Sequence, residues 1–371
     1  MKKAFIIFSG YNQRAVIAFI RTLENSDIQY GIIANSKNDP ILLTEYRNKV
    51  LVVRNSQRLV WVEILKYIEI VQEKMGAKRY VIAPSTESLN RFLLANREKF
   101  RKYHCEIPLV DKELYERISD KYEFQKICND NGILTPKELE RLDLVSFPYV
   151  AKPKKYMSDN GDIYSPELIF DRKDHLSFIG TKKVGDFYYQ EFIRGRSLYL
   201  LYYFYKDGTV EKFSQENYIQ QSNGCSIIAA VSSGFHLKEE SLKYEELFRS
   251  LNFFGLVMVE VKQYKNKSFM IEANPRFWGP SQLFMDAGIN LFQGLLYDMG
   301  MVGKKPSFKK QTKTTRYFWF GGMLKTLFEK EEMSYHGYSP EKYMKSLPDW
   351  ISADIYRRKD TYKIFRGETR V

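Results

Sequence analysis

The first hundred residues alternate between short apolar runs and longer amphipathic segments, and this alternation restricts the fold more than any other feature of the sequence. Apolar runs of strand length lie at 3–10, 29–35, 49–53 and 79–84, and helical spacing of apolar residues lies at 12–23 and 59–75. Such alternation indicates a parallel sheet with helices on both faces. The loops around 9–14 and 85–87 follow two of the strands. We therefore expect them to meet at the carboxyl edge, where open α/β sheets bind ligands.

From about residue 119 the pattern changes to strands and helices that are interleaved differently. A helix is predicted over 119–132, with Ser119 at its N-cap and Gly132 just past its end. Further predicted elements are a strand at 146–153, a hairpin of 187–195 with 197–208 that 208–215 continues, a helix at 241–253 and a hairpin of 255–264 with 267–275. Together they indicate an α+β module of roughly two hundred residues.

The composition argues against several classes of protein. Three cysteines among 371 residues, odd in number and widely spaced, argue against a disulfide framework. Four histidines without ligand spacing argue against a zinc site. The apolar run at the N-terminus is too short for a signal peptide, and no stretch approaches the about 20 apolar residues of a membrane span. We therefore expect a cytoplasmic protein that is not inserted in a membrane.

The formal net charge of +13 is concentrated towards the C-terminus. Residues 301–371 hold 16 of the 58 Lys and Arg but only 8 of the 45 Asp and Glu. A basic segment of this kind suits nucleic acid, an anionic lipid surface or a phosphorylated substrate. We favour a solvated basic face instead, because acidic residues interrupt the segment throughout and no nucleic-acid-binding signature accompanies it. No nucleic-acid partner is expected.

The segment "MIEANPRFWGP" at 270–280 carries the most informative spacing of polar residues. Glu272, Asn274 and Arg276 are two residues apart, so a strand would point all three to one side. Glu260 lies on the preceding predicted strand. A connecting loop with an odd number of residues would place it opposite Glu272, whereas an even-numbered loop would place it on the other face.

Two facing carboxylates are unfavourable unless a cation lies between them. Glu260, Glu272 and the amide oxygen of Asn274 are hard ligands that suit Mg²⁺ (or Mn²⁺) shared with a phosphate group. Arg276 would then neutralise a phosphoryl group during its transfer. The alternative is a surface hairpin with scattered charges, which four polar groups in register make the weaker interpretation.

Two lysines and one apolar strand supply the other parts that a nucleotide site needs. Lys121 lies in the first turn of its predicted helix, where the helix dipole disfavours a cation, which indicates either a bound anion nearby or a lysine that lies in solvent. Lys152 interrupts an apolar strand before a polar loop, which indicates either a phosphate partner or an edge-strand lysine that reaches solvent. The run of Gln190, Glu191 and Ile193 offers a backbone edge and an apolar face to a nucleobase, although most such runs are core strands.

These segments, in this order, resemble the ATP-grasp superfamily. "SDKYEFQKICNDNGILTP", "PYVAKP", "YYQEFIRG", "GLVMVEVK" and "MIEANPRFWGP" are similar to its successive nucleotide- and metal-binding segments, over about 119–290. The early α/β region is similar to the domain before the grasp in biotin carboxylase and carbamoyl phosphate synthetase. With the later "TTRYFWFGGML", the chain most resembles short carbamoyl-phosphate-synthetase-like proteins, many of them predicted carboxylate–amine ligases.

The resemblance implies a Rossmann-like domain before the grasp at 1–113, a two-lobed ATP-grasp fold at 114–300 with a lid lobe at about 145–195, and a basic C-terminal extension at 301–371 packed on it. It implies that Lys121 and Lys152 contact ATP phosphates, with Lys152 and Arg276 in catalytic roles. Gln190, Glu191 and Ile193 would form the adenine hinge, and Glu260, Glu272 and Asn274 would hold Mg²⁺. This chain departs from the family in a lid loop with a single glycine, Gly161, and in Ser197, where many relatives have an acidic residue for the ribose.

The implied reaction joins a carboxylate to an amine. ATP would phosphorylate the carboxylate to an acyl phosphate, and the amine would displace phosphate to give an amide with release of ADP. Activation of bicarbonate, as in a carboxylase, is the rival within enzymes, and an ATP-binding regulator without turnover is a third interpretation. The expected partners are small-molecule acids and amines, and a homodimer is the default assembly.

The acid or amine is expected between the grasp and the first domain. The candidates are polar and loop-like: Ser9, Gly10, Asn12, Arg14, Ser85, Thr86, Glu87, Gly224 and Ser226. Gly10 has a second interpretation as a turn residue, and Ser85 and Thr86 as a helix cap. Cys225 is expected to line the pocket and not to act as a nucleophile.

Overall fold

The computed structural model describes residues 3–140, 146–154, 156–157, 163–308 and 313–369. The first hundred residues form a parallel sheet, as the alternation predicted, with strand order β3-β2-β1-β4-β5. Its strands are β1 (Lys3–Phe8), β2 (Tyr30–Ala34), β3 (Val50–Val53), β4 (Arg79–Ile82) and β5 (Cys105–Glu106). Its helices are α1 (Gln13–Asn25), α2 (Trp61–Met75), α3 (Glu87–Ala95) and α4 (Arg97–Lys102).

Alternating side chains of β1 place helices on both faces of this sheet. Phe5 and Ile7 pack with the buried face of α1, whereas Ile6 and Phe8 pack with α2 and α3. The apolar face of α1 also meets the second part of the molecule, because it shares a core with Phe277, Phe284 and Phe292. The first domain is thus joined to the rest of the chain by a continuous hydrophobic core.

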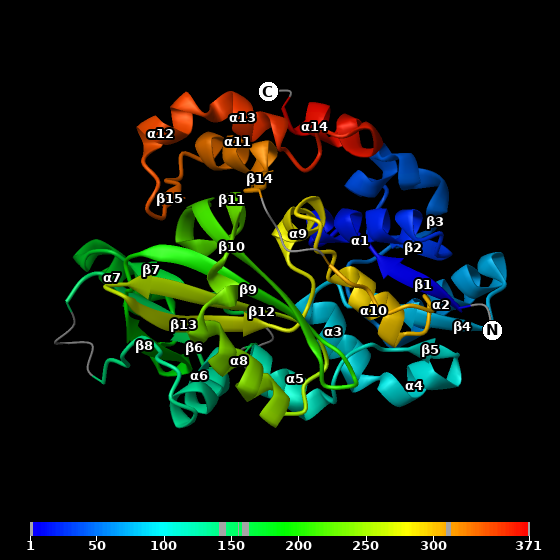
Figure 1. Cartoon of the computed structure of the whole chain (residues 1–371), viewed down its shortest axis with the longest axis horizontal. Helices are drawn as coiled ribbons and strands as arrows, with labels where there is room; N and C mark the ends of the chain where they lie inside the picture. The colour runs from blue at the N-terminus through cyan, green and yellow to red at the C-terminus, as the bar shows by residue number, and fades with distance from the viewer. Residues whose placement is uncertain (1–2, 141–145, 155, 158–162, 309–312, 370–371) are drawn as a thin grey trace.

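A large antiparallel sheet forms the centre of the molecule, with path β13-β12-β9-β10-β11-β14 and with β15 paired to β10. Its strands are β9 (Arg196–Phe204), β10 (Val210–Gln220), β11 (Ile227–Ser233), β12 (Gly255–Tyr264), β13 (Lys267–Asn274), β14 (Arg316–Phe318) and β15 (Ser334–Tyr335). One face packs on α1, α9 (Gln282–Asp286) and α10 (Phe292–Asp298). The other packs on α5 (Lys112–Ser119), α6 (Lys121–Asp130) and α8 (Glu239–Ser250), which lie below the sheet in Figure 1.

A small antiparallel sheet of β7-β6-β8 lies beside α6 and carries its own apolar cluster with α7 (Arg172–Thr181). Its strands are β6 (Tyr149–Pro153), β7 (Glu167–Ile169) and β8 (Phe187–Glu191). The predicted hairpin of 187–195 with 197–208 is wrong, because β8 pairs with β6 whereas β9 pairs with β10 and β12. Between them Gly195, at φ +149°, passes so close to β12 that a Cβ would lie 2.2 Å from the Gln263 carbonyl oxygen. At Gly195 the chain therefore passes from the small sheet to the large sheet and does not form a hairpin.

Two local predictions around α6 had different outcomes. Gly132 lies just past the helix end with φ +66°, as predicted. Ser119 is not the N-cap, because it is the last residue of α5. The carboxylate of Asp120 caps α6 instead and accepts hydrogen bonds from Tyr122 N and Glu123 N. Both residues are good N-caps, and only the end of α5 decides between them.

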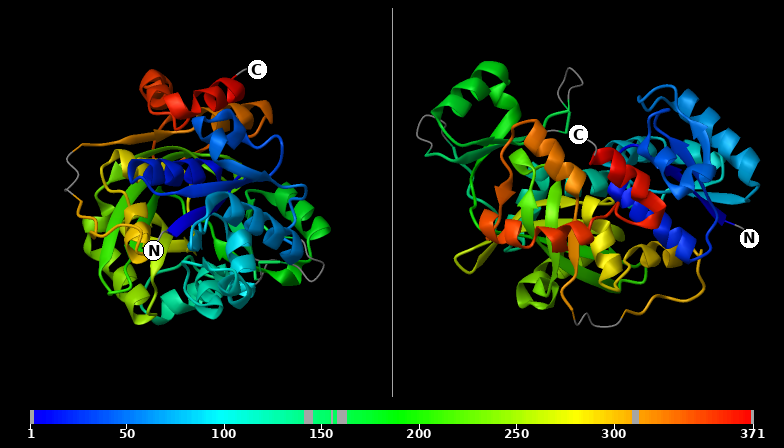
Figure 2. Two further views of the ribbon diagram at one scale, coloured as in Figure 1. Left: turned by 90° about the vertical axis from the view of Figure 1, so that its right-hand side faces the viewer. Right: turned by 90° about the horizontal axis from the view of Figure 1, so that it is seen from above.

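The C-terminal segment covers both parts of the molecule. Its β14 extends the large sheet beside β11, and α14 lies against the first domain (Figure 2). Its helices are α11 (Phe320–Phe328), α12 (Pro340–Lys345), α13 (Leu347–Ser352) and α14 (Tyr362–Glu368). Asp360 accepts two hydrogen bonds from the Arg21 guanidinium of α1, at 2.7 and 3.0 Å. Among the described residues, no helix is long and apolar enough to cross a membrane.

Candidate functional site

Glu260 on β12 and Glu272 on β13 are direct cross-strand partners on one face of the large sheet. The connecting turn, Lys265 and Asn266, has two residues, and both have positive φ. An even turn alone would have placed Glu272 on the opposite face. A bulge supplies the extra residue, because Val261 pairs with Met270 whereas Glu260 pairs with Glu272. The predicted pairing of the carboxylates is confirmed, through a bulge that the sequence pattern did not indicate.

The side chains of "EANPR" form one hydrogen-bonded set on this face. Asn274 Nδ2 donates to Glu272 Oε1 at 2.7 Å, and Arg276 Nη2 donates to Asn274 Oδ1 at 3.0 Å. Lys121, in the first turn of α6, lies 2.7 Å from the other oxygen of Glu272. The predicted common side of Glu272, Asn274 and Arg276 is confirmed, and Lys121 is brought to it from another element.

Lys152 reaches the same place from the small sheet. Its side chain is 5% exposed, and Nζ donates to the carbonyl oxygen of Ile271, the extra residue of the bulge, at 2.8 Å. It is therefore a buried lysine and not an edge-strand lysine that reaches solvent. The described residues give Lys152 no carboxylate at ion-pair distance, and the more distant Glu272 and Glu260 favour its charged form.

The pKa values of the two carboxylates in this cluster are shifted in opposite directions. Burial raises the pKa of Glu260, and the neighbouring Glu272 adds to the rise against the opposing effect of Lys262. Burial would also raise the pKa of Glu272, but Lys121 and the hydrogen bond from Asn274 outweigh it and lower this pKa. Burial and the nearby charge of Lys121 lower the pKa of Lys152 to about 8. Such perturbed groups gathered at one place are typical of functional sites.

The donor set fits a magnesium ion that is shared with phosphate. Among the residues that the structure describes, no three or more His, Cys, Asp or Glu side chains form a metal site by themselves. The chemistry available is two paired carboxylates and the amide of Asn274. Mg²⁺ commonly takes one or two carboxylates from the protein and its remaining ligands from phosphate and water, so these residues suit it.

The predicted adenine hinge lies at the junction of β8 and β9. Gln190 is buried and its Nε2 donates to Gln125 Oε1 and Pro136 O, while its Oε1 is left without a partner. The amide of Glu191 donates to Lys137 O, and a side-chain oxygen of Glu191 accepts from Lys137 N. Gln190 and Glu191 thus have partners inside the protein, and Ile193 follows in the segment that leads to Gly195. The single-glycine part of the lid loop at Gly161 lies outside the described residues.

The first-domain loops reach the segment after Arg276. Asn12 donates from Nδ2 to Ser85 O and to Phe277 O, both at 2.9 Å, and so joins the two predicted loops to the segment that follows β13. Thr86 caps α3 through the Leu89 amide, and Glu87 accepts from Arg91, so both are used by the helix. The expected meeting of these loops at the carboxyl edge is confirmed.

Ser9 and Gly10 are held by contacts inside the first domain. Ser9 is buried and its Oγ donates to Asp39 Oδ2 at 2.6 Å. Gly10 has φ +93°, and a Cβ there would lie 2.2 Å from Asn35 Cβ. Its interpretation as a turn residue therefore has direct structural support.

Arg14 connects the first domain to the large sheet and to the C-terminal segment. Its Nη1 donates to Ile227 O and Tyr317 Oη, and its Nη2 donates to Ser226 Oγ at 2.9 Å. The guanidinium stacks on Trp319, 3.8 Å from the ring centroid. Gly224 lies in the same 222–226 loop, where its carbonyl accepts from Gln220. Arg14, Ser226 and Gly224 are thus brought together as candidates for a substrate site.

Several residues near the site were missed in the sequence. Tyr199 of β9 is the cross-strand partner of Glu260. Burial raises the pKa of Tyr199, and the nearby Glu260 and Glu272 raise it further, whereas Arg276 and Arg14 lower it. Tyr156, from the loop after Lys152, stacks with Arg91 of α3 at 4.4 Å. Lys262 and His336 are in contact on the Glu260 side of the sheet. The period of two along β12 could have indicated Lys262, whereas nothing local indicates contacts between distant segments.

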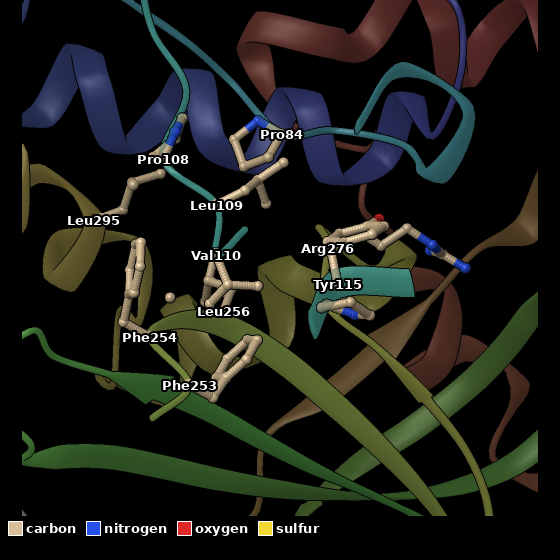
Figure 3. Close-up of a pocket in the computed structure, with 12 residues that line it drawn as sticks. Pro84, Pro108, Leu109, Val110, Tyr115, Phe253, Phe254, Leu256, Arg276 and Leu295 are labelled. Carbon is tan, nitrogen blue, oxygen red and sulfur yellow. The ribbon is translucent and has the colours of Figure 1, made fainter. Parts of the chain in front are cut away.

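A small apolar pocket lies behind Arg276 (Figure 3). Proline and leucine side chains from the first domain and from β12 line it, and the Arg276 guanidinium points away from it. Its lining includes Pro84, Leu109, Val110, Phe253, Phe254 and Leu295. The pocket has no group of carboxylates and lysines like the one around Glu260. We therefore place the reaction on the other side of Arg276.

Comparisons with known proteins support the fold through structure alone. No family model matches the sequence, and no curated protein matches it. The biotin carboxylase domain of Hydrogenobacter thermophilus 2-oxoglutarate carboxylase, solved with MgADP, ADP and bicarbonate, matches with TM-score 0.64 and 13% identity over 85% of this chain and 73% of that one. Campylobacter jejuni biotin carboxylase matches with TM-score 0.62 and 15% identity, over 85% and 74%.

A second kind of enzyme has the same fold. N5-carboxyaminoimidazole ribonucleotide synthetase from Thermus thermophilus matches with TM-score 0.61 and 13% identity, over 84% of this chain and 82% of that one. At these identities the likeness concerns the fold. The chain has the mixed α/β fold of these solved enzymes, with parallel and antiparallel sheets, which is the kind of fold that the sequence resemblance implied.

Proposed function

We propose that the protein is an ATP-dependent carboxylate–amine ligase that forms an amide through an acyl phosphate and releases ADP and phosphate. The observation that carries this proposal is the in-register pair of Glu260 and Glu272, with Lys121 and Lys152 beside it. Cations and paired carboxylates from four elements, β12, β13, α6 and β6, converge there, on a fold that solved ATP-dependent enzymes share.

In this proposal each residue acts through charge and position. Glu260, Glu272 and Asn274 hold Mg²⁺, which when bound supplies positive charge to the β- and γ-phosphates. Lys121 and Lys152 bind phosphate oxygens, and Arg276 stabilises the charge of the γ-phosphoryl group during transfer. Gln190, Glu191 and Ile193 lie at the nucleobase end.

The carboxylate oxygen of the acid attacks the γ-phosphorus, and the bond to ADP breaks. The amine then attacks the acyl carbon, phosphate leaves, and the amine gives up a proton. The substrates are proposed to lie between the first domain and the large sheet, near Asn12, Arg14 and Ser226. The expected contribution of the protein is to orient the two reactants and to exclude water from the acyl phosphate.

The proposal includes the division of the chain into domains. The parallel sheet suggests a Rossmann-like domain at 1–113, although α5 crosses its proposed end. The small sheet with α7 and the large sheet suggest the two lobes of the grasp at 114–300. We further propose a cytoplasmic location, small-molecule partners and no nucleic-acid partner. We also propose a homodimer, which sedimentation analysis would test.

The test is a phosphate- and ADP-release screen of acid and amine pairs, followed by mass spectrometry of the product. We expect Glu272→Ala and Arg276→Ala to reduce turnover by at least about 100-fold, the order of loss when one group that stabilises a transition state is removed. Lys126→Met, an exposed lysine on the same helix as Lys121, is the matched control. Near-wild-type rates in either active-site variant would refute the residue roles.

Activation of bicarbonate is the second candidate, because biotin carboxylases share the fold and one of them was solved with bicarbonate. Release of ADP on addition of bicarbonate without an organic acid would favour it. Binding of MgATP without turnover across a broad panel would instead favour a regulator.

A further inference from the structure

Lys262 lies two residues after Glu260 on β12, on the same side of the strand. Residues two apart on a strand lie on one face, about 6.6 Å apart. Its cross-strand partner on β9 is Ser197, whose hydroxyl accepts from Asn217 Nδ2 at 3.1 Å. The row next to Glu260 is therefore polar and presents an ammonium group.

The ammonium of Lys262 is held by a histidine from the C-terminal segment. Lys262 Nζ lies 3.3 Å from His336 Nδ1, and His336 Nε2 lies 3.1 Å from Gln220 Oε1. Gln220 donates its own Nε2 to the carbonyl oxygens of Gly224 and Cys225, so its Oε1 is an acceptor. Because Gln220 Oε1 accepts, His336 Nε2 carries a proton, and Lys262 Nζ contacts both ring nitrogens of this neutral imidazole, at 3.3 and 3.5 Å.

Within the described part of the chain, no carboxylate lies at ion-pair distance from the Lys262 ammonium, and its hydrogen-bonding contact is His336. The neutral imidazole offers at most one acceptor nitrogen, so it cannot use all three ammonium donors. A partly buried cation with a neutral partner and free donors favours a ligand that offers an acceptor atom.

The proposed nucleobase end lies beside this row. The segment after β8 that carries Ile193 reaches Gly195, which is in close contact with the backbone of Gln263, the residue after Lys262. A nucleotide with its phosphates at Glu260 and Glu272 and its base at this segment would bring its nucleoside part alongside Lys262. The inference therefore rests on the proposed function.

We propose that Lys262, positioned by His336, donates a hydrogen bond to an acceptor atom of the nucleoside part of the bound nucleotide. The test below distinguishes two acceptors, N7 of the purine and the 2′- and 3′-hydroxyl oxygens of the ribose. His336 is a positioning residue, and through it the C-terminal segment completes the nucleotide site. The competing explanation is that Lys262 only offsets the charge of Glu260.

The test is calorimetric titration of the full chain with MgADP, Mg-7-deaza-ADP and Mg-2′,3′-dideoxy-ADP. We expect Lys262→Met to raise the Kd of MgADP at least about tenfold, the lower end of the usual loss for one hydrogen bond from a charged donor. We also expect the analogue that lacks the acceptor to bind the wild type about tenfold more weakly, and to bind the variant as tightly as ADP does. This pattern would identify N7 or the ribose as the acceptor.

Other patterns would overturn the inference. An unchanged Kd of MgADP in Lys262→Met would do so, and so would an equal weakening of all three nucleotides, which would indicate an effect on Glu260 alone. The analogue comparison in the wild type does not depend on how well the variant folds. If the wild type binds no MgADP, the proposed function fails as well. If MgADP binds but Lys262 has no effect, only this inference fails.

The role of His336 is tested separately. We expect His336→Ala to raise the Kd of MgADP about threefold and His336→Gln to restore it, because glutamine keeps an acceptor for Lys262. The matched control is His236→Gln, since His236 is also buried but bonds to Ser214, on the face of the large sheet opposite to Glu260. A Kd that His336→Ala leaves unchanged would contradict the positioning role.

Discussion

Lys152 Nζ donates to the carbonyl oxygen of Ile271, the residue whose insertion as a bulge brings Glu272 opposite Glu260. The same irregularity thus sets the register of the carboxylates and provides the acceptor for the lysine. It also joins the small sheet to the large one at the point where we place the phosphates. Because two separate sheets meet there, the site depends on their docking.

Replacement of Lys152 should weaken nucleotide binding without lowering the stability of the unliganded protein. Lys152→Met removes a buried ammonium that has no ion-pair partner among the described residues, so we expect the unliganded protein to keep its melting temperature or gain a few degrees. The rise in melting temperature on addition of MgATP should be largely lost. Thermal denaturation with and without MgATP measures both, and Lys154→Met, on an exposed lysine, is the control. An undiminished MgATP shift in Lys152→Met would contradict the phosphate role.

Nucleotide affinity should fall at alkaline pH. The pKa of Lys152 is lowered to about 8, chiefly by burial, so the charged form is lost as the pH rises through this value. A bound phosphate favours the charged form, and above about pH 8 binding must therefore take up a proton. We expect the Kd of MgADP to rise by up to about tenfold per pH unit above pH 8 in the wild type, and to change much less in Lys152→Met. Parallel profiles in calorimetry would refute this assignment.

The contact between Arg21 and Asp360 should contribute strongly to stability. The guanidinium is largely buried and also donates to Gln282 Oε1, while Asp360 accepts from Tyr46 Oη at 2.6 Å. Asp360→Ala leaves a buried charge without its partner, and we expect a loss of about 3–5 kcal/mol in the free energy of unfolding. Urea denaturation measures it. The double variant Arg21→Met/Asp360→Ala should recover part of the loss, and a loss below about 1 kcal/mol would indicate a solvated pair.

His236 should make the protein less stable in mild acid. Burial lowers its pKa to about 4 from the ordinary value of 6.5. The unfolded chain therefore binds a proton at a higher pH than the native protein, and stability falls as the pH drops from about 6.5 towards 4. We expect His236 to account for about 2 kcal/mol of the difference between pH 7 and pH 5. Urea denaturation at both pH values should show a smaller difference in His236→Gln, and an identical one would refute the prediction.

Local patterns predicted much of the fold. The alternation in the first hundred residues indicated a parallel sheet because apolar periodicity reports which side of each element is buried. The same reasoning failed for β8 and β9, since periodicity does not say which strand a given strand pairs with. At 119–120 two adjacent capping residues gave the wrong choice, because the end of α5 is set by its packing.

The sequence by itself determined the residue types of the site and the common side of Glu272, Asn274 and Arg276, because a strand alternates its side chains whatever its surroundings. Only the tertiary structure decided that Lys121 meets Glu272, that Lys152 meets the Ile271 carbonyl, and that His336 reaches Lys262. These contacts join residues that are 151, 119 and 74 positions apart. They depend on how separate sheets and the C-terminal segment pack, and no local spacing encodes that packing.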